Sequence, residues 1–293
     1  MKLALNGATT MRATLAQDIE AASAAGFEYL EIWAAKLRRF LQSQTTAELK
    51  SLFTEAQLKP YSINSIEHIT FRDAGAQAQL LDECEELCQI AAELDCPYIV
   101  VVPGRLPAGL KSASEVIEES VRVLTQLSLI AAHYGVALAF EFLGQTDCSV
   151  QTLAVADEIV KQVGRANVGL VIDSFHFYAG GSTIESIEAL DASRLFIFHI
   201  NDAEDRPRTQ LEDYHRLLPG LGILPLKEIA CALRRIGYDR VASIEIFRPE
   251  YWERDPTELA REAHAATLRV LNLAEANSGK TEANSGENGG AGA

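Results

Sequence analysis

Short apolar runs alternate with longer segments of helical periodicity along most of this chain. Nearly continuous apolar runs joined by helical crossovers predict a parallel sheet covered by helices. In the segment from Thr14 to Gly26, for example, apolar residues recur at helical spacing and a glycine marks the end. The eight predicted strands are Lys2–Asn6, Glu28–Trp33, Pro60–Ser65, Tyr98–Pro103, Val136–Phe142, Val168–Phe175, Leu195–Asp202 and Val241–Phe247.

Eight strand-then-helix units predict a single (β/α)8 TIM barrel of the α/β class over residues 1–274. A doubly wound sheet is the structural alternative, but eight regular units fit closure better. From Glu275 onward the chain repeats EANSG and carries no large apolar residue. We therefore expect residues 275–293 to form a disordered tail, because burial cannot offset the entropy of ordering them.

The composition limits the class of partner. The net charge of −15 repels phosphate backbones and anionic lipids, which argues against nucleic-acid and membrane partners. The N-terminal apolar run is too short for a signal peptide, and five cysteines without CxxC spacing are typical of reduced thiols. We expect a cytoplasmic protein. Exposed barrel helices often pair, so a homo-oligomer is a further expectation.

Ionisable residues end four successive predicted strands, where barrel enzymes carry their chemistry. These residues are Glu141, Asp173, His199 and Glu245. Alone, each fits a structural role, as a carboxylate paired with arginine or a hydrogen-bonded core histidine. Together, three carboxylates and a histidine would repel each other without a cation. The set therefore predicts one divalent metal ion, for which Mn²⁺, Mg²⁺, Co²⁺ and Zn²⁺ are all suitable.

The same residues resemble the metal site of the xylose isomerase-like barrel superfamily. That superfamily includes ketose 3-epimerases, hydroxypyruvate isomerases, inosose isomerases and dehydratases, and endonuclease IV-type DNA repair enzymes. The motifs DSFH (Asp173–His176), HIND (His199–Asp202) and PGLG (Pro219–Gly222) carry the resemblance. The stretches LALNGATT, VGLVIDSFHF, FIFHINDAED and IEIFRPEYW are more narrowly similar to the inosose (2-keto-myo-inositol) isomerases of bacterial inositol catabolism.

The resemblance implies a metal-dependent isomerase of a keto-cyclitol such as inosose. Glu141 and Glu245 would be both metal ligands and the acid/base pair, which moves a proton through a metal-bound cis-enediolate. The resemblance also implies that His176 contacts substrate oxygens.

Further substrate contacts are expected from residues near other strand ends. Arg216, just before LLPGLG, matches the position of a rim arginine in the inosose isomerase group, and it either binds substrate or is a surface residue. Glu31, at the end of the second strand, either binds a hydroxyl or His176 or forms a salt bridge within the barrel. Asn6 carries an amide suited to a polyol. His68 is a candidate in the loop after the third strand, where that isomerase group has an apolar residue, so the exact substrate stays open.

Other activities would use the same metal site. A ketose 3-epimerase returns the proton to the same carbon, and a hydroxypyruvate isomerase uses the same enolate chemistry. A dehydratase or eliminase of a keto-cyclitol or 3-keto-sugar needs an acid, which His68 or His176 could supply. DNA cleavage is disfavoured by the acidic charge and by the lack of a histidine after the fourth strand. Against a non-catalytic sugar-binding barrel stands the intact set of four ligands.

Overall fold

The computed structural model describes residues 1–109 and 112–285, with side chains described to residue 272. Parallel strands close into a barrel, which confirms the predicted (β/α)8 architecture and excludes the doubly wound sheet. In order around the barrel, the strands are β1 (Lys2–Asn6), β10 (Val241–Ile244), β7 (Leu195–Ile200), β6 (Val168–Asp173), β5 (Ala137–Glu141), β4 (Tyr98–Val101), β3 (Lys59–Ile66) and β2 (Tyr29–Trp33).

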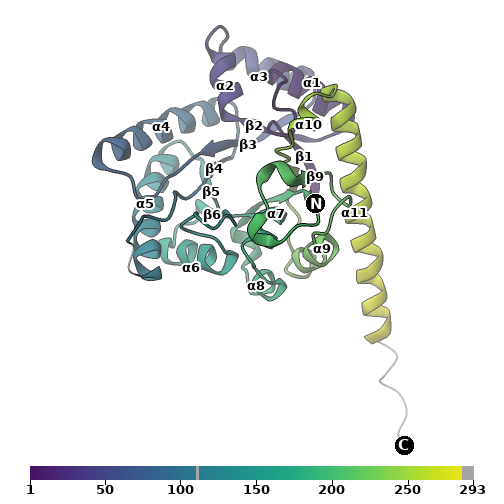
Figure 1. The fold of residues 1–293 in the computed structure, drawn as a ribbon. Coiled ribbons are helices and arrows are strands. Elements are labelled where there is room, and N and C mark those ends of the chain that lie inside the picture. Colours follow the sequence, from purple (N-terminus) through teal and green to yellow (C-terminus); the bar gives the residue numbers. More distant parts are fainter. Residues whose placement is uncertain (110–111, 286–293) are drawn as a thin grey trace, which may run out of the picture.

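Helices surround this barrel on its outside (Figure 1). They are α1 (Leu15–Ala25), α2 (Ala34–Leu41), α3 (Thr46–Glu55), α4 (Ala74–Glu93), α5 (Ala113–His133), α6 (Leu153–Val163), α7 (Ser174–Ala179), α8 (Ile184–Glu188), α9 (Leu226–Arg235), α10 (Pro249–Trp252) and α11 (Pro256–Ser285). The long helix α11 packs against α1 and α9, so the C-terminal part of the barrel closes onto its first helix.

The helical part of the chain reaches beyond residue 274. Helix α11 extends to Ser285, so it includes the start of the segment predicted to be disordered. Residues 286–293 lie outside the described residues. The domain boundary at residue 274 and the disorder of residues 275–293 therefore stay predictions.

Helix signals in the sequence act where they were expected. Thr14 caps α1 through a capping box. Its Oγ1 accepts a hydrogen bond from the backbone N–H of Gln17, and the Gln17 side chain accepts one from the backbone N–H of Thr14. Gly26 ends the same helix with a φ of 86°, in the left-handed region that glycine adopts without strain. Strand ends were predicted less well. The predicted strand to Phe175 stops at Asp173, because the Asp173 side chain caps α7 through the His176 backbone N–H.

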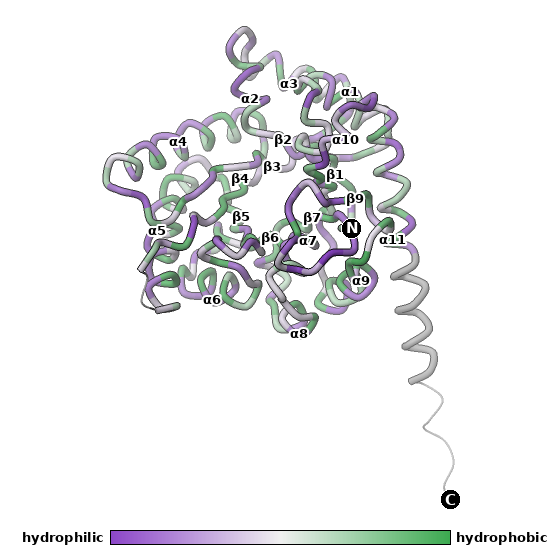
Figure 2. The backbone as a smooth tube through the Cα atoms, viewed as in Figure 1, coloured by the Kyte–Doolittle hydropathy of each residue, from purple (hydrophilic) through white to green (hydrophobic). Residues whose placement is uncertain are grey.

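The core has two layers, one inside the barrel and one between the strands and the helices. The barrel interior is filled by Ala4, Tyr61, Val100, Val102, Ala139, Val171, Phe196, Ile197 and Val241. The larger outer layer is built from the other faces of the strands and the inner faces of the helices, and Figure 2 shows apolar positions recurring along both. Most of these residues lie in the N-terminal and middle parts of the strands, whereas Val102 follows the end of β4. Polar groups occupy the C-terminal ends of β5, β6 and β7.

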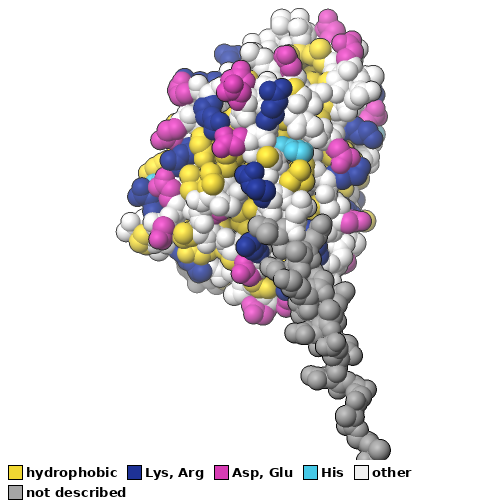
Figure 3. All heavy atoms as spheres, turned by 90° about the vertical axis from the view of Figure 1, so that its right-hand side faces the viewer, with side chains coloured by type: hydrophobic (Ala, Val, Ile, Leu, Met, Phe, Trp, Pro, Cys, Tyr) yellow, Lys and Arg dark blue, Asp and Glu magenta, His cyan; other side chains and the backbone are white. Residues whose placement is uncertain are grey.

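Side chains of both charges are interspersed over the face seen in Figure 3. All five cysteines are free thiols, and four of them are buried, as expected for reduced thiols packed as small apolar residues. Within the described ranges, no helix has both the length and the apolar character needed to cross a bilayer.

Candidate metal centre and active site

Strand alternation directs the polar residues at the strand ends into the barrel. Successive side chains of a strand point to opposite faces, so a residue two positions after an interior residue also points inward. Ala139, Val171 and Ile197 lie in the barrel interior. The residues two positions later in the same strands are Glu141, Asp173 and His199. Phe196 also lies in the interior, because the register between β6 and β7 shifts at this residue, and regular alternation resumes from Ile197.

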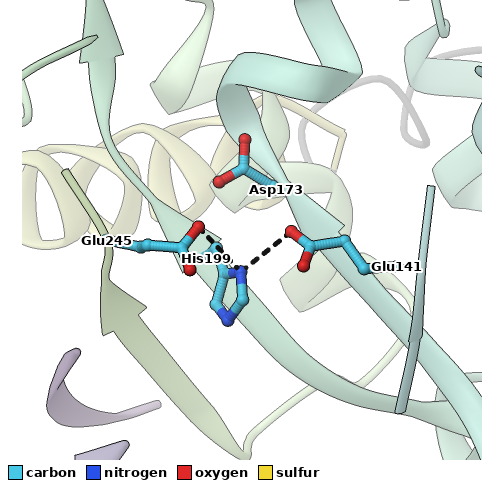
Figure 4. Close-up of side chains that lie close together, drawn as sticks. All are labelled: Glu141, Asp173, His199 and Glu245. Atoms are coloured by element: carbon cyan, nitrogen blue, oxygen red, sulfur yellow. Dashed lines mark hydrogen bonds and ion pairs between the residues drawn. The ribbon is translucent and has the colours of Figure 1, made fainter. Parts of the chain in front are cut away.

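The four predicted metal ligands lie together. Glu141, Asp173, His199 and Glu245 are all buried, and one ligand atom of each lies within 4.8 Å of the others. The carboxylates of Glu141 and Glu245 point toward His199 from opposite sides, with Asp173 on a third side (Figure 4). His199 Nδ1 is 3.0 Å from Glu141 Oε1 and 3.4 Å from Glu245 Oε2. One nitrogen and three carboxylates fit a divalent cation with positions left for a substrate.

Burial and crowding shift the ionisation of this cluster. Burial raises the pKa of Glu245 to about 8, with Glu141 and Asp173 adding to the rise and His199 and Arg216 opposing it. Burial opposes protonation of His199, yet the carboxylates of Glu245, Glu31 and Glu141 raise its pKa well above the usual value. Negative charge is therefore crowded at this point, and a divalent ion would relieve the repulsion.

His199 is held from behind by Glu31. Both carboxylate oxygens of Glu31 lie 3.1 Å from His199 Nε2, while Nδ1 faces the other carboxylates. Burial works to raise the pKa of Glu31, but His199 lowers it below the usual range. The hydrogen bond on Nε2 orients the ring and leaves Nδ1 for a metal, as outer-shell carboxylates do in metal sites. Glu31 thus contacts a candidate ligand, and its predicted substrate contact stays a prediction.

Two asparagines hold the Glu245 carboxylate. Asn64 Nδ2 donates to Glu245 Oε1 at 2.8 Å and to Glu31 Oε1 at 3.1 Å. Asn6 Nδ2 donates to the same Glu245 oxygen at 3.1 Å. Glu245 Oε1 is therefore fixed by neutral donors, and Asn6, predicted to bind substrate, lies in the site beside a predicted catalytic group.

Asn201 supports Asp173, a contact that sequence analysis did not identify. Its Nδ2 donates to Asp173 Oδ2 at 2.7 Å, and its Oδ1 accepts from Ser174 Oγ at 2.9 Å. The HIND motif contains Asn201, so its place two residues after His199 was the available signal. Nothing local indicated that it would meet a carboxylate of the neighbouring strand.

Arg216 lies inside the site and not on the surface. Its side chain is 1% exposed, and its guanidinium lies between the rings of Phe175 and Phe247, at 4.8 and 5.0 Å from their centroids. Nη1 donates to Asp173 Oδ2 at 2.9 Å and to Glu245 Oε2 at 3.0 Å. This rules out the surface alternative, while the role of Arg216 in substrate binding stays a prediction.

A short antiparallel pair brings Arg216 to this position. Strand β9 (Arg216–Leu217) pairs with β8 (Asp202–Ala203), which follows β7. Asp202 accepts hydrogen bonds from the backbone of Gly220 and Leu224, which ties the PGLG turn to the same strand. The loop that carries Arg216 is therefore anchored to the barrel at both ends.

His176 is buried with a defined pattern of hydrogen bonds. Arg216 Nη2 lies 3.0 Å from His176 Nε2. Because a guanidinium only donates, Nε2 accepts and the proton of the neutral ring is on Nδ1. Nδ1 is buried and has no partner among the described residues. Burial also lowers the pKa of His176, against the attraction of Asp173. The neutral ring therefore carries a buried Nδ1–H with no partner among the described residues.

His68 lies apart from the buried cluster. Its side chain is 60% exposed, and its nearest ion-pair partner is Glu67, at 3.9 Å. It lines a cavity of about 240 Å³ together with Trp33 and Asn64, and Asn64 also contacts Glu245. The cavity thus adjoins the cluster through Asn64, and the predicted substrate contact of His68 stays a prediction.

Comparison with known proteins agrees with this geometry. The model of the xylose isomerase-like TIM barrel family matches residues 19–270. The chain belongs to this family. It is 39% identical to the inosose isomerase of Bacillus subtilis over 274 residues, which are 92% of this chain and 98% of that enzyme. It is also 38% identical to the inosose isomerase of Halalkalibacterium halodurans, covering 92% of this chain and 96% of that enzyme.

A solved structure supports the same grouping. The crystal structure of the IolI protein with a bound zinc atom superposes with a TM-score of 0.90 at 38% identity, covering 93% of this chain and 99% of that chain. Identity at this level along almost the whole of both chains identifies this family member as an isomerase that carries a candidate metal site.

Proposed function

We propose that this isomerase acts on a keto-cyclitol, with inosose (2-keto-myo-inositol) as the substrate, and that it depends on one divalent metal ion. The observation that carries the proposal is the position of Glu141 and Glu245 on opposite sides of one buried N/O₃ cluster. Similarity to inosose isomerases along almost the whole chain supports the substrate class. The zinc atom belongs to the IolI structure, and Mn²⁺, Mg²⁺, Co²⁺ and Zn²⁺ all suit this donor set.

The mechanism divides the proton transfer between the two glutamates. A bound divalent ion supplies Lewis-acid polarisation of the substrate carbonyl and would be held by Glu141, Asp173, His199 and Glu245. Glu245, held through Oε1 by Asn6 and Asn64, removes the proton from the carbon beside the carbonyl. Protonated Glu141, on the opposite side, delivers a proton to the former carbonyl carbon. The proton of the adjacent hydroxyl passes to the former carbonyl oxygen, which completes the isomerisation, and exchange with solvent returns the two glutamates to their starting protonation.

Arg216 and His176 would stabilise the enediolate that forms between these steps. The guanidinium is always charged and already lies against Glu245 Oε2, so it can donate to a developing oxyanion beside that group. The free Nδ1–H of His176 offers a second donor. His176 therefore acts as a neutral donor that binds substrate oxygens.

The arrangement of His176 favours isomerisation over dehydration. A dehydratase needs an acid to protonate the leaving hydroxyl, and an imidazole acts as that acid best when it is protonated. Arg216 donates to Nε2, so a proton on that nitrogen would face a cation. His68 remains the candidate acid for a dehydratase, and its exposed position outside the cluster makes it the weaker one.

A ketose 3-epimerase is the second candidate. The chain is 29% identical to the D-psicose 3-epimerase of Enterocloster bolteae over 238 residues. Glu141 and Glu245 lie on opposite sides of the cluster. A substrate bound between them would also suit epimerisation, because the proton would leave one face of a carbon and return on the other. The substrate decides between these two candidates.

We further propose a cytoplasmic role in inositol catabolism, with a small-molecule substrate and no nucleic-acid or membrane partner. The four inosose isomerases that resemble the chain support this placement, and the net charge of −15 agrees with the absence of polyanionic partners.

The experiment follows proton exchange on the substrate. The Mn²⁺-loaded protein is incubated with 2-keto-myo-inositol in D₂O, and the products are analysed by proton NMR. We expect deuterium beside the carbonyl and a carbonyl shifted to the neighbouring carbon, with both lost in Glu245→Gln. An absence of exchange on inosose, with exchange on a ketohexose, would replace this proposal with the epimerase. Loss of water from the substrate would replace it with a dehydratase.

A further inference from the structure

Asp213 lies at the outer end of the hydrogen-bond network that leads into the cluster. It opens the short 3-10 helix η3 (Asp213–His215), immediately before Arg216. Its Oδ1 accepts from Arg216 Nη2 at 2.8 Å, and its Oδ2 accepts from Gln145 Nε2 at 3.0 Å. Gln145 lies in the loop after β5. One carboxylate thus joins two loops of the barrel mouth to a buried guanidinium.

The geometry of Arg216 gives this contact its importance. The central carbon of the guanidinium lies over the rings of Phe175 and Phe247, at 4.8 and 5.0 Å from their centroids. These aromatic contacts are not directional at the Nη atoms, so hydrogen bonds along the edges of the guanidinium set where Nη1 and Nη2 point. Nη1 is held by Asp173 and Glu245, which are candidate metal ligands, and Nη2 by His176 and Asp213.

Asp213 is the carboxylate on Arg216 that lies outside the candidate metal cluster. When Asp173 and Glu245 bind a cation and a substrate, their carboxylate oxygens would be shared between these ligands and Arg216. Asp213 lies outside the cluster, so its hydrogen bond to Nη2 would remain available while a cation and a substrate are bound. The hydrogen bond from Nη2 to Asp213 also keeps Nη2 directed at His176 Nε2, and this keeps the His176 proton on Nδ1.

We propose that Asp213 is a positioning residue, which aims the Arg216 guanidinium at the reacting oxygens and holds His176 as the Nδ1–H donor. This inference rests on the proposed isomerase function. Asp213 is 43% exposed, so its replacement removes the contact without opening a cavity in the core. The residue has no direct contact with the candidate ligands and acts through Arg216.

The test compares Asp213→Ala and Asp213→Asn with the matched control Asp205→Ala. Asp205 is an exposed aspartate of the same loop that does not contact Arg216. For Asp213→Ala we expect kcat to fall about 10- to 100-fold, the range for outer-shell partners, with KM, Mn²⁺ affinity and melting temperature unchanged. Asp213→Asn keeps an oxygen that can accept from Nη2 and should recover much of the lost kcat.

Two results would overturn the proposal. One is a kcat for Asp213→Ala equal to that of Asp205→Ala. The other is a fall in kcat matched by falls in Mn²⁺ affinity and melting temperature, which would give Asp213 a purely structural role.

A separate readout distinguishes this inference from the proposed function. If the wild-type protein shows no exchange on any substrate, the proposed function fails, and Asp213 is judged from ¹⁵N NMR of the arginine side chains. Arg216 should then show slowly rotating Nη groups in the wild type and averaged signals in Asp213→Ala, with Arg216→Lys providing the assignment. Identical Arg216 signals in both proteins would overturn the positioning role.

Discussion

At the scale of single residues, the site depends on pairs in which one side chain orients another. Glu31 holds Nε2 of His199, and Asn64 bridges Glu31 and Glu245. Such second contacts fix which atom faces a metal or a substrate. The sequence indicated that Glu31 belongs to the site. Because Glu31 contacts His199, we expect its replacement to change metal affinity, whereas loss of a substrate contact would change KM.

Glu31→Gln should weaken Mn²⁺ binding about 10- to 100-fold, because an amide holds the His199 ring less firmly and makes it a poorer ligand. Calorimetric titration of Mn²⁺ into metal-free protein measures the affinity. Glu67→Gln, an exposed glutamate after β3, is the control. Unchanged Mn²⁺ affinity with an increased KM would instead assign Glu31 to the substrate.

His68→Ala should raise KM for inosose and leave kcat unchanged. The imidazole lines the cavity that adjoins Asn64 but does not join the buried cluster, so it would contact the part of the substrate that does not react. Steady-state kinetics of the isomerisation check this expectation. A fall in kcat with KM unchanged would make His68 part of the chemistry, as the dehydratase alternative requires.

At the scale of elements, a buried ion pair fixes the loop between β1 and α1. Lys36 of α2 donates to Asp18 Oδ2 at 2.7 Å and to the carbonyl oxygens of Gly7 and Thr10, at 2.9 and 2.8 Å. Burial raises the pKa of Asp18 to about 7, against the attraction of Lys36. Burial also lowers the pKa of Lys36, which Asp18 opposes. The loop that follows Asn6 is therefore held by a costly but fully bonded pair.

The raised pKa of Asp18 gives a pH dependence with a defined sign. Between about pH 4, the ordinary value for an unfolded aspartate, and pH 7 the folded protein binds a proton that the unfolded chain has lost. The contribution of Asp18 to stability is therefore complete below about pH 4 and is lost as the pH rises through 7. Urea unfolding of wild type and Asp18→Asn between pH 4 and 8 measures this pH-dependent contribution to the free energy of unfolding, which should be absent in the variant. A pH dependence common to both proteins would contradict it.

Lys36→Met should lower the free energy of unfolding by about 3–5 kcal/mol at pH 8, since it leaves a buried carboxylate unpaired. The loss should be smaller at pH 5, where Asp18 takes up a proton. The double variant Asp18→Leu/Lys36→Met should recover most of the stability, because two apolar side chains leave no unpaired charge. Equal free energies of unfolding for Lys36→Met and wild type would contradict a stabilising role of this ion pair in the loop.

Gly144→Ala should destabilise the protein by about 1–3 kcal/mol and lower activity. A Cβ at this position would lie 2.5 Å from the carbonyl oxygen of His176 and 2.6 Å from the backbone nitrogen of Gly180, so α7 would have to move. Gly75→Ala, in the first turn of α4, is the control and should be neutral or stabilising. Thermal unfolding and isomerase assays of both variants check this, and an unaltered Gly144→Ala enzyme would contradict the tight packing.

At the scale of the whole molecule, the site joins strands that are far apart in the sequence. The candidate ligands lie in β5, β6 and β7 and directly after β10. The barrel closes where β10 pairs with β1. An ion bound at the site would bind the folded chain and not the unfolded one. Metal binding would therefore be coupled to global stability.

Adding Mn²⁺ to metal-free protein should raise the free energy of unfolding by about 2.7 kcal/mol at a free ion concentration of 100 Kd. Thermal unfolding with and without a chelator measures the shift in melting temperature. Asp173→Ala should lose the shift, whereas Glu67→Gln should keep it. A wild-type melting temperature that does not respond to Mn²⁺, Mg²⁺, Co²⁺ or Zn²⁺ would contradict the metal centre.

The sequence by itself determined the barrel and the inner ring of the site. Both follow from local periodicities: strand alternation fixes which face a residue occupies, and a barrel brings every strand end to one mouth. For that reason Glu141, Asp173, His199 and Glu245 could be assigned to one cluster before any contact was known.

Only the tertiary structure decided what surrounds this ring. Arg216 lies between Phe175 and Phe247 because a loop after β7 folds back as β9, and Asp213 meets Gln145 across the mouth. These contacts join loops of different strands, and loop paths have no periodicity that the sequence could reveal. They depend on barrel closure, which is set by the packing of the whole chain.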